Sequence, residues 1–426
     1  EFVPLTTTQG LTITQLKKIV GSKSVIIWGA GHLGKVIRVS LRRYGLLISA
    51  FCDGNIALQG SYIKDTEIIS PAVAITRAKK GKSIIVIASI QHRDAIQKQC
   101  ESHGLYLKVN YLLYLHISRP ESVIDISGKC NITCPSCPRG NMSQFLNEGL
   151  MSLDDFNKVF IKLLSEVPLL SLINLSGWGE PLLNPDLPKI IKMTEEKVPC
   201  TLSTNLQNIN FLEETIYAQP SQFVISISGF GAHYENMHLG AKWQVLIKNL
   251  FFLKKLIKKI KPSTEFRVLY HLYKNNQGED LEKIKKLCSD LKIKLVTTVA
   301  YLNPYEQTLS YCKEEGLNNK VQQTMNELAW DIDLALKLSL QDRKLPCLCQ
   351  RIFPIINWNL SVSLCHIYYG PIIAQNFLNI NYKDLLTLRH NQSQCRTCQS
   401  HSLHRLDFDI LQRRYPKEKL LLSRGK

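Results

Sequence analysis

The sequence predicts an α/β protein in which strands and helices alternate along most of the chain. Three observations predict this class. A strand, a glycine-rich turn, a helix and a second strand follow one another near the N-terminus. Six strand-like runs then alternate with helix-like runs through the middle of the chain. Eight of the thirteen cysteines fall into two tight clusters, the second of which indicates a small cysteine-rich part near the C-terminus.

Length and composition limit the classes of protein that need to be considered. At about 100–200 residues per domain, a chain of 426 residues predicts two to four domains. Hydrophobic residues make up 45% and charged residues 21%, which is typical of a soluble globular protein. No apolar run reaches the roughly 18–20 residues of a membrane span. No basic segment followed by an apolar one marks a secretory signal, so we expect a cytoplasmic location.

The chain is strongly basic, with a formal net charge of +18. This charge favours acidic partners, which include phosphorylated metabolites, anionic lipid headgroups and nucleic acid. One basic run, Lys254–Lys261, lies in a segment with apolar residues at helical spacing. It indicates a half-buried helix with a solvated basic face, or an anion-binding surface.

After a leader over residues 1–19, residues 20–118 predict a small Rossmann-like domain. The strand Val25–Trp28 runs into a turn that contains three glycines, and the strand Leu47–Cys52 ends at an acidic residue. Such a turn lets backbone N–H groups approach a phosphate at a helix N-terminus. The nucleotide-binding candidates are Gly29, Gly31, Gly34 and Asp53. A purely structural tight turn is the other interpretation. The segment resembles the small nucleotide-binding domain that precedes some sugar acetyltransferases.

Residues 119–302 predict an open, partial (β/α)6 barrel of TIM type. Repeated βα units imply parallel strands, and six units fall short of the eight of a closed barrel. The predicted strands are Val123–Ser127, Leu172–Ser176, Thr201–Thr204, Phe223–Ser228, Glu265–His271 and Lys294–Val299. The predicted helices include Leu153–Glu166, Asp186–Lys197, Lys242–Lys261 and Glu279–Leu291. We expect the site at the carboxyl ends of the strands.

Three further segments complete the predicted organisation. Residues 303–345 form a mostly helical connector. Residues 346–410 form the small cysteine-rich domain, with a strand-like run over Pro354–Val362. Residues 411–426 form a basic tail.

Three cysteines, Cys130, Cys134 and Cys137, follow the first predicted barrel strand. Three thiolates on one loop can hold three irons of a cubane cluster and leave the fourth iron open to another ligand. The alternatives are free cysteines or a zinc site, and zinc needs a fourth ligand that the neighbouring sequence does not offer.

This loop, Cys-Asn-Ile-Thr-Cys-Pro-Ser-Cys, resembles the cluster loop of radical S-adenosylmethionine (radical SAM) enzymes. Gly177-Trp178-Gly179-Glu180-Pro181 resembles the Gly-Gly-Glu-Pro element of that family, and Thr204-Asn205 and Ser226-Ile227-Ser228-Gly229 also stand at predicted strand ends, as in the family. The likeness covers about residues 119–300. Leu206 departs from it, because the family often has glycine there.

The resemblance implies a chemistry and a set of site residues. It implies a 4Fe-4S cluster on the three cysteines, whose open iron binds S-adenosylmethionine, and reductive cleavage to a 5′-deoxyadenosyl radical that abstracts hydrogen. Gly177 and Gly179 would let the main chain approach the methionine moiety, and the Glu180 carboxylate would pair with its ammonium group. Asn205 and Ser226 would hydrogen-bond its ribose or carboxylate. A flavodoxin- or ferredoxin-type protein would donate the electron.

The C-terminal cysteines resemble the auxiliary-cluster extension of that family, called SPASM or Twitch. The ligands implied for one auxiliary 4Fe-4S cluster are Cys349, Cys365, Cys395 and Cys398, with Cys347 as the alternative to Cys349. A structural zinc site is the other interpretation. His401 and His404 are interpreted as surface histidines or replacement ligands. Asn359-Leu360 stand where the family has Asp-Gly in a hairpin turn.

The resulting hypothesis is a radical SAM enzyme acting on a small molecule that is a sugar or is linked to a nucleotide. The reaction types considered are dehydrogenation and epimerisation, and Cys312 is the candidate hydrogen donor for the latter. One alternative is an enzyme that modifies a ribosomally made peptide. The other is a non-catalytic iron–sulfur scaffold or nucleic-acid-binding protein, which the charge favours and the intact cysteine triad disfavours.

Overall fold

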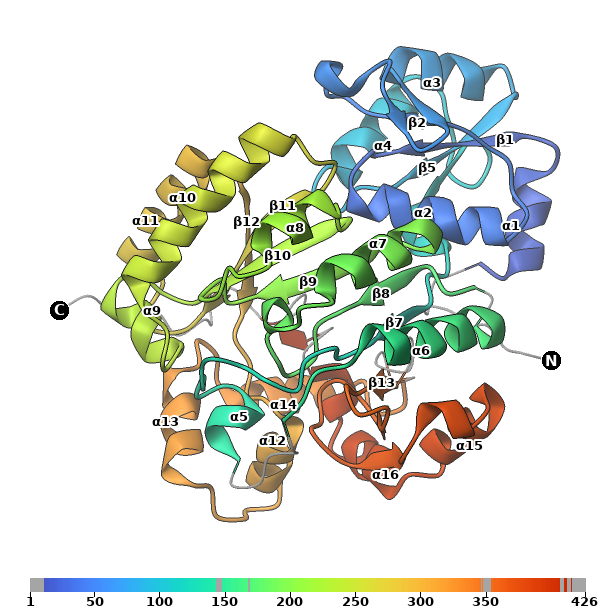
Figure 1. Ribbon diagram of the computed structural model, residues 1–426. Coiled ribbons are helices and arrows are strands. Elements are labelled where there is room, and N and C mark those ends of the chain that lie inside the picture. The colour runs from blue at the N-terminus through green and yellow to red at the C-terminus, as the bar shows by residue number, and fades with distance from the viewer. Residues whose placement is uncertain are drawn as a thin grey trace. The chain divides into compact units, whose positions relative to one another are not determined.

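The computed structural model describes residues 11–142, 148–167, 169–345, 347, 354–406, 410, 411 and 415. It is a mixed α/β structure with two six-stranded sheets and one three-stranded sheet. The chain divides into two compact units (Figure 1). The first holds the residues up to Glu121 together with Val167–Ile173 and Glu196–Pro199, and the second holds the remainder. Within the described ranges, no helix is both long and apolar enough to cross a membrane.

The first unit is built on a sheet with the strand order β3-β4-β2-β1-β5-β6. Its strands are β1 (Ser24–Trp28), β2 (Ile48–Cys52), β3 (Tyr62–Ile63), β4 (Thr66–Ile69), β5 (Ser83–Ile87) and β6 (Tyr111–Leu113). The pairs β1–β2, β1–β5, β2–β4 and β5–β6 are parallel, and β3 pairs antiparallel with β4. The strand, glycine turn, helix and strand predicted at the start of this unit are all present.

Helices cover both faces of this sheet, because its central strands are apolar on both sides. Alternate residues of β1 enter different cores: Val25 and Ile27 pack on one face, and Ile26 and Trp28 on the other. The first face is covered by α1 (Ile13–Val20) and α2 (His32–Arg43), the second by α3 (Pro71–Lys79) and α4 (Arg93–Ser102) (Figure 1). Such two-sided burial is the pattern expected of parallel strands in an α/β layer structure.

The second sheet contains its six strands in chain order, β7 to β12, as the repeated βα units predict. They are β7 (Glu121–Val123), β8 (Leu172–Asn174), β9 (Cys200–Thr204), β10 (Gln222–Ile227), β11 (Glu265–Leu272) and β12 (Lys294–Val299). The pairs from β9 to β12 are parallel. The first strand is shorter than predicted. After Val123 the chain leaves the ladder, and Ile124 and Ser127 form isolated bridges to Ile356 and Leu150.

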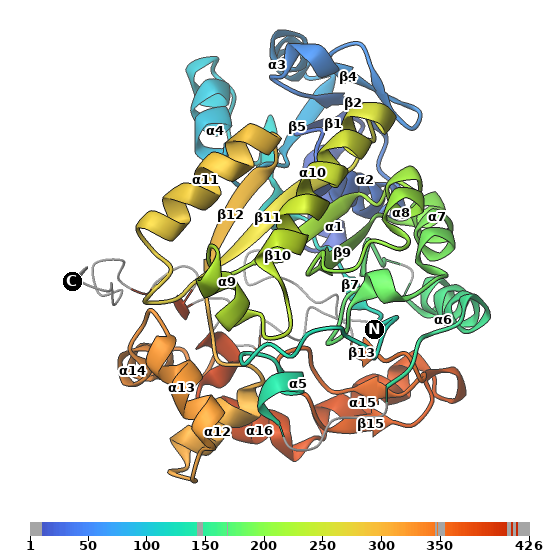
Figure 2. The same cartoon turned by 60° about the vertical axis from the view of Figure 1, so that its left-hand side comes forward.

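Helices follow the strands of this sheet. They are α5 (Pro138–Asn141), α6 (Leu153–Glu166), α7 (Leu187–Lys197), α8 (Leu212–Tyr217), α9 (Ala232–Met237), α10 (Trp243–Ile260) and α11 (Glu279–Leu291). Figure 2 shows α10 and α11 along one face of β10 to β12. The predicted amphipathic pattern of α10 is borne out, since Leu246, Leu250 and Leu253 are fully buried while its lysines stay on the other side.

The remaining elements of the second unit are short. The predicted connector contains α12 (Tyr305–Cys312), α13 (Asn319–Glu327) and α14 (Ile332–Leu340). The cysteine-rich part has an antiparallel sheet of β13 (Ile355–Ile356), β14 (Val362–Ser363) and β15 (Ile372–Ala374), followed by α15 (Tyr382–His390) and α16 (Ser393–Ser400). Single 3-10 turns lie at Ile56–Leu58, Tyr114–His116, Pro181–Leu183, Phe377–Asn379 and Leu403–Arg405.

The run predicted as one strand over Pro354–Val362 is a hairpin, with a turn between β13 and β14. Leu360 occupies the left-handed region in this turn, with φ of +67°. The turn forms although leucine stands where glycine would fit more easily, because Asn357 and Ser361 close it with a backbone hydrogen bond of 2.8 Å.

We expect Leu360→Gly to be more stable than Leu360→Ala by about 1 kcal/mol, since a Cβ in the left-handed region costs about 1–2 kcal/mol. Both variants remove the isopropyl group of the leucine and differ only in the Cβ, so their difference isolates the backbone strain. Urea unfolding of the two proteins measures it. Equal stability, or a more stable alanine variant, would show that the turn carries no such strain.

Candidate functional site

The cysteine loop follows β7 and ends in α5. The backbone N–H of Cys137 donates to the carbonyl of Cys134 at 3.0 Å, and Pro138 then begins α5. A Cβ on Gly140 would lie 2.2 Å from the Cys134 carbonyl oxygen, so only glycine fits this close approach. The N–H of Thr133 donates to the carbonyl of Leu239 at 2.8 Å, which fixes the loop to the segment after α9.

The three thiols of this loop have raised pKa values. Burial raises the pKa of Cys130 to about 11. Burial also raises the pKa of Cys134, and the neighbouring Cys137 and Cys130 raise it further. Without a cation the thiols therefore stay protonated at neutral pH, and only a bound metal would ionise them.

Two observations bear on whether these residues fit a metal cluster. No described cysteine is disulfide-bonded, so the thiols are available as ligands. As the described side chains stand, no group of three or more His, Cys, Asp and Glu is arranged to hold a metal ion. The three thiols, which interact electrostatically, fit an iron–sulfur cluster. Each iron of a cubane takes one thiolate, whereas a single metal ion would need several donors around one point.

Glu180 lies at the start of the turn Pro181–Leu183 and is 2% exposed. Its Oε1 accepts hydrogen bonds from Thr204 Oγ1 at 2.7 Å and from the N–H of Leu182 at 3.0 Å. Its Oε2 accepts from the N–H of Asn205 at 2.8 Å. Burial raises the pKa of Glu180 to about 7 despite these three donors. A carboxylate in this position is poised to gain from a cationic partner.

Gly177 and Gly179 leave room for the segment after β7. A Cβ on Gly177 would lie 2.3 Å from Asp125 Cγ, and one on Gly179 would lie 1.6 Å from the Ser127 carbonyl oxygen. This packing explains both glycines without a ligand, and main-chain contact with methionine stays a prediction. Trp178 packs its ring edge-on to Tyr369 at 6.4 Å between centroids.

Asp125 is a residue whose role the sequence reasoning missed. Its Oδ2 accepts from the N–H of Trp178 at 2.9 Å, and burial raises its pKa to about 6. It therefore ties the Gly177–Glu180 loop to the strand end that carries the cysteines. A carboxylate within the apolar run Val123–Ile126 is the sequence signal that could have found it.

Asn205 joins the end of β9 to the cysteine loop. Its Nδ2 donates to Asn131 Oδ1 at 2.9 Å and lies 3.7 Å from Cys130 Sγ, while its Oδ1 accepts from the N–H of Gln207 at 2.8 Å. Ser226, on β10, shares a hydrogen bond of 2.9 Å with Ser203. The structure thus brings Asn205 and Glu180 to the cysteine loop, and no direct contact joins Ser226 to it among the interactions described.

Leu206 follows in the left-handed region, with φ of +54°, and is fully buried. The backbone at this position has the conformation that a glycine would adopt easily, although the side chain is a leucine. Asn249 Nδ2 donates to the Leu206 carbonyl at 2.8 Å and holds the turn.

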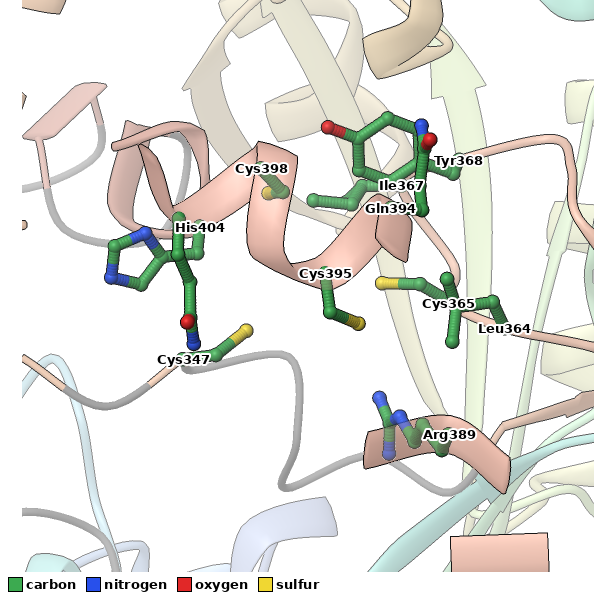
Figure 3. A pocket seen from close by; sticks show the side chains of 11 residues that line it. Cys347, Leu364, Cys365, Ile367, Tyr368, Arg389, Gln394, Cys395, Cys398 and His404 are labelled. Atoms are coloured by element: carbon green, nitrogen blue, oxygen red, sulfur yellow. The ribbon is translucent and has the colours of Figure 1, made fainter. Parts of the chain in front are cut away.

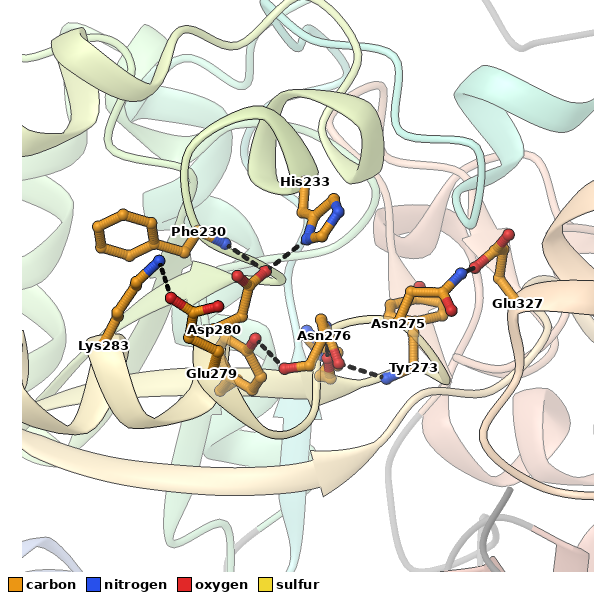
Figure 4. Close-up of polar contacts among 11 residues, drawn as sticks. Phe230, His233, Tyr273, Asn275, Asn276, Glu279, Asp280, Lys283 and Glu327 are labelled. Carbon is orange, nitrogen blue, oxygen red and sulfur yellow. Dashed lines mark hydrogen bonds and ion pairs between the residues drawn. The ribbon is translucent and has the colours of Figure 1, made fainter. Parts of the chain in front are cut away.

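The loop after β11 is fixed by the polar contacts drawn in Figure 4. Asn276 donates from Nδ2 to the carbonyl of His271 at 2.7 Å and accepts at Oδ1 from the N–H of Tyr273 at 2.8 Å. Asp280 accepts from the N–H of Phe230 at 3.1 Å and lies 2.8 Å from His233 Nδ1. These contacts connect the ends of β10 and β11.

The C-terminal cysteines come together in a second place, shown in Figure 3. Cys347, Cys365, Cys395 and Cys398 line one pocket. Burial raises the pKa of Cys398, and the other three thiols raise it further. Cys349 lies outside the described residues, so the choice between Cys347 and Cys349 as a ligand stays a prediction.

Two further residues that line this pocket are His404, a sequence candidate, and Arg389, which the sequence reasoning did not place there. His404 is only 1% exposed, in contrast to the surface position considered for it, and its Nε2 lies 2.9 Å from the Leu345 carbonyl. Arg389 is 5% exposed. Burial raises the pKa of Cys395, and the nearby Arg389 guanidinium offsets part of this rise. A buried cation beside four thiols is suited to a centre of net negative charge.

We expect Arg389→Gln to lower the reduction potential of an iron–sulfur centre in this pocket by tens of millivolts, because a nearby positive charge stabilises the reduced, more negative state. Arg396→Gln is the matched control, since Arg396 is exposed on the same helix as Cys395. Redox titration followed by electron paramagnetic resonance measures the reduction potential in the two variants. An unchanged potential, or a pocket that takes up zinc and no iron, would contradict the expectation.

Cys312 belongs neither to the cysteine loop nor to the pocket of the C-terminal cysteines. It stands at the end of α12 and lines a cavity of about 570 Å³ with acidic residues that include Glu314, Glu315 and Asp333. Burial raises the pKa of its thiol. None of the residues that line this cavity belongs to the cysteine loop. Its role as a hydrogen donor stays a prediction.

The glycine turn of the first unit has a structural explanation. Gly29 has φ of +127°, and a Cβ there would lie 2.5 Å from the Ala88 carbonyl oxygen. A Cβ on Gly34 would lie 1.9 Å from the Gly29 carbonyl oxygen. The Asp53 carboxylate accepts from the N–H of Ala30 at 3.0 Å, and Gly31 stands at the N-cap of α2. Nucleotide binding by these residues stays a prediction.

The comparisons with known proteins assign the chain to no family. No protein-family model matches the chain. Cytochrome P450 85A1 of Solanum lycopersicum is 26% identical over 203 residues, which are 46% of this chain and 40% of that protein. The chain thus spans less than half the length of this curated protein, and a match of this extent establishes no relationship.

Several solved structures have a similar chain path at low identity. BtrN in complex with AdoMet and 2-DOIA is 15% identical, with a TM-score of 0.36 over 67% of this chain and 88% of that one. The anSMEcpe protein with bound AdoMet is 16% identical, with a TM-score of 0.43 over 68% and 92%. Streptococcus suis SuiB bound to precursor peptide SuiA is 15% identical, with a TM-score of 0.44 over 73% and 75%. Scores this low establish no relationship.

Proposed function

We propose that the protein is a radical SAM enzyme that cleaves S-adenosylmethionine reductively and abstracts hydrogen from a small molecule. The observation that carries the proposal is the meeting of three segments far apart in the chain. The cysteine loop, Glu180 and Asn205 are joined by hydrogen bonds from the amide of Asn205 to Cys130 Sγ and from its backbone to the Glu180 carboxylate. Thiols for a redox centre thus stand beside a buried carboxylate suited to an ammonium group.

Each of these residues has a task in this proposal. Cys130, Cys134 and Cys137 would hold a 4Fe-4S cluster, which in its reduced form would supply the electron that breaks the sulfonium carbon–sulfur bond. Glu180 pairs with the ammonium group of S-adenosylmethionine, and burial strengthens the pair. Asn205 keeps one lone pair of Oδ1 for a ligand hydroxyl. Ser226 offers a hydroxyl to its ribose or carboxylate.

The same proposal assigns the parts of the chain. Residues 20–118 are a Rossmann-like domain and residues 119–302 a partial (β/α)6 barrel, and the strand orders of the two large sheets support both assignments. Residues 346–410 are a SPASM/Twitch-like domain with one auxiliary 4Fe-4S cluster. The four thiols around one pocket and the buried Arg389 support that assignment.

We assign the substrate class from the charge of the chain. A sugar phosphate or a nucleotide-linked metabolite carries phosphate groups that the net charge of +18 would attract. Dehydrogenation would send one electron to the auxiliary cluster and release a proton, whereas epimerisation would need a hydrogen donor such as Cys312. A flavodoxin- or ferredoxin-type protein would supply the reducing electron.

Substrate-dependent release of 5′-deoxyadenosine tests the substrate class. The reconstituted protein, with dithionite and S-adenosylmethionine, is incubated with a panel of nucleotide sugars and sugar phosphates and, separately, with synthetic peptides. We expect at least a tenfold rise in 5′-deoxyadenosine with a member of the first panel. A rise with peptides alone would replace the sugar assignment by peptide modification.

A further inference from the structure

The outward side of α10 carries lysines and one exposed aromatic ring. Lys248, Phe251, Lys255 and Lys258 follow one another at intervals of three or four residues, so they share one face of the helix. All four are exposed, and Phe251 keeps 46% of its surface accessible. The helical rise makes this basic stripe about 15 Å long. It lies on the side of α10 away from the buried leucines of the helix and from the sheet that they cover (Figure 2).

The three lysines of the basic stripe are unpaired within the part of the chain that the structure describes. No ion pair or hydrogen bond joins their ammonium groups to another described residue, and α10 contains no Asp or Glu. By contrast, two exposed lysines on other helices lie beside a carboxylate. Lys158 is 2.6 Å from Asp154, and Lys285 is 2.7 Å from Glu282. The stripe therefore keeps a positive charge that its described neighbours do not neutralise, and it is suited to an anionic partner.

The composition and shape of this face favour a lipid surface over a nucleic acid. α10 has five lysines and no arginine, and lysine lacks the planar fork with which arginine binds a phosphate in a fixed geometry. Val245, three residues before Lys248, is 37% exposed and adds a second apolar side chain to that of Phe251. Single-stranded nucleic acids are bound in basic grooves, whereas the outer face of a helix is convex. Several lysines on an amphipathic helix, with an aromatic ring among them, are typical of contact with anionic headgroups.

We propose that the outward face of α10 binds the surface of an anionic lipid membrane. The ammonium groups of Lys248, Lys255 and Lys258 lie against the headgroup phosphates, and the ring of Phe251 enters the interfacial layer between them. The contact is peripheral, because the opposite face of α10 is buried in the core of its own unit and is not available to lipid. This inference goes beyond the proposed function and does not depend on a metal cluster.

Two triple variants test whether the position of the charge matters. In the stripe variant, the three lysines of the basic stripe are replaced together by glutamine. The control variant combines Lys158→Gln, Lys189→Gln and Lys285→Gln, which are exposed lysines that each lie within reach of a nearby carboxylate. Both variants lose three positive charges and therefore have the same net charge. All six side chains are on the surface, so we expect both proteins to fold, and circular dichroism checks this.

Co-sedimentation of the full chain with vesicles measures the affinity. The probes are vesicles of phosphatidylcholine alone, vesicles of equal parts phosphatidylcholine and phosphatidylglycerol and, separately, a single-stranded oligonucleotide. We expect the original protein and the control variant to bind the anionic vesicles alone, and added salt to weaken this binding. The stripe variant should bind the anionic vesicles about tenfold more weakly or less. Phe251→Ser should weaken binding about fivefold, because it removes the apolar contact.

Three results would overturn the proposal or a part of it. If the original protein does not bind the anionic vesicles, the membrane contact is wrong, and binding to the oligonucleotide alone would assign the face to nucleic acid instead. Equal vesicle affinity of the stripe variant and the control variant would show that the net charge attracts the lipid and that this face does not. An unchanged affinity of Phe251→Ser would overturn the insertion of the aromatic ring.

Discussion

Replacing Cys134 by alanine is expected to abolish formation of 5′-deoxyadenosine, with a loss of at least a hundredfold. The thiol lies in the middle of the cysteine loop and interacts electrostatically with Cys130 and Cys137. Two remaining thiols cannot hold the cubane that three can, because each bound iron needs its own ligand. Iron analysis of the reconstituted variant and product quantification by mass spectrometry measure the effect.

Cys288→Ala provides the control for this prediction. Cys288 is also buried, lies on α11 and has a raised pKa caused by burial, but it belongs to neither cysteine cluster. We expect it to keep full iron content and activity, with a modest loss of stability. Equal activity of Cys134→Ala and the original protein would contradict the assignment of the loop.

Replacing Glu180 by glutamine is expected to raise the dissociation constant of S-adenosylmethionine by tenfold or more. In the proposed function the buried carboxylate is the negative partner of the ligand ammonium, and removing one member of a buried charge pair leaves the other uncompensated. Glu306→Gln is the control. Glu306 also has a pKa raised by burial and accepts backbone hydrogen bonds, but it lies beside Gly370 and Tyr369. We expect its replacement to leave the affinity for S-adenosylmethionine unchanged.

The same substitution is expected to change the pH dependence of stability in the metal-free protein. The pKa of Glu180 rises from 4.5 to about 7 on folding, so between these values the folded state binds more protons than the unfolded state. Its free energy of unfolding therefore falls as pH increases from about 4.5 to 7, by up to about 3 kcal/mol. Glutamine does not titrate.

Urea unfolding from pH 4.5 to 8 measures this difference. We expect the free energy of unfolding to fall less with rising pH in the Glu180→Gln variant than in the original protein. The part of the fall that is due to Asp125 is present in both proteins. Parallel stability curves for the two proteins would contradict the raised pKa of Glu180.

The sequence predicts the elements of the second unit closely where the apolar pattern is regular. Helices Leu153–Glu166 and Glu279–Leu291 and strand Lys294–Val299 begin and end where their patterns do. The pattern fails after Val123, because the Asp125 carboxylate accepts from the N–H of Trp178 in the Gly177–Glu180 loop. The Asp125 N–H donates to the carbonyl of Ile356 on β13, which lies outside the sheet of β7 to β12. Contacts between segments distant in the chain are not encoded in local periodicity.

In the candidate site, too, local sequence patterns could be predicted and contacts between distant segments could not. The spacing of Cys130, Cys134 and Cys137 and the position of Glu180 at a strand end are visible in the sequence. His238 could not be found from the sequence, because it is a single histidine in a loop. Only the structure shows that its Nδ1 lies 3.4 Å from Cys134 Sγ. Leu206 and Leu360 stand where the sequence resemblance leads us to expect glycine, and both have left-handed backbone angles. At these positions the residue type alone would not have predicted the backbone conformation.

Formation of 5′-deoxyadenosine decides whether the protein carries out radical SAM chemistry. The clusters are reconstituted without oxygen, dithionite and S-adenosylmethionine are added, and the product is quantified by mass spectrometry with and without the sugar panel. We expect formation of 5′-deoxyadenosine that depends on dithionite and disappears in Cys134→Ala. A protein that takes up no iron and forms no product under any of these conditions would contradict it.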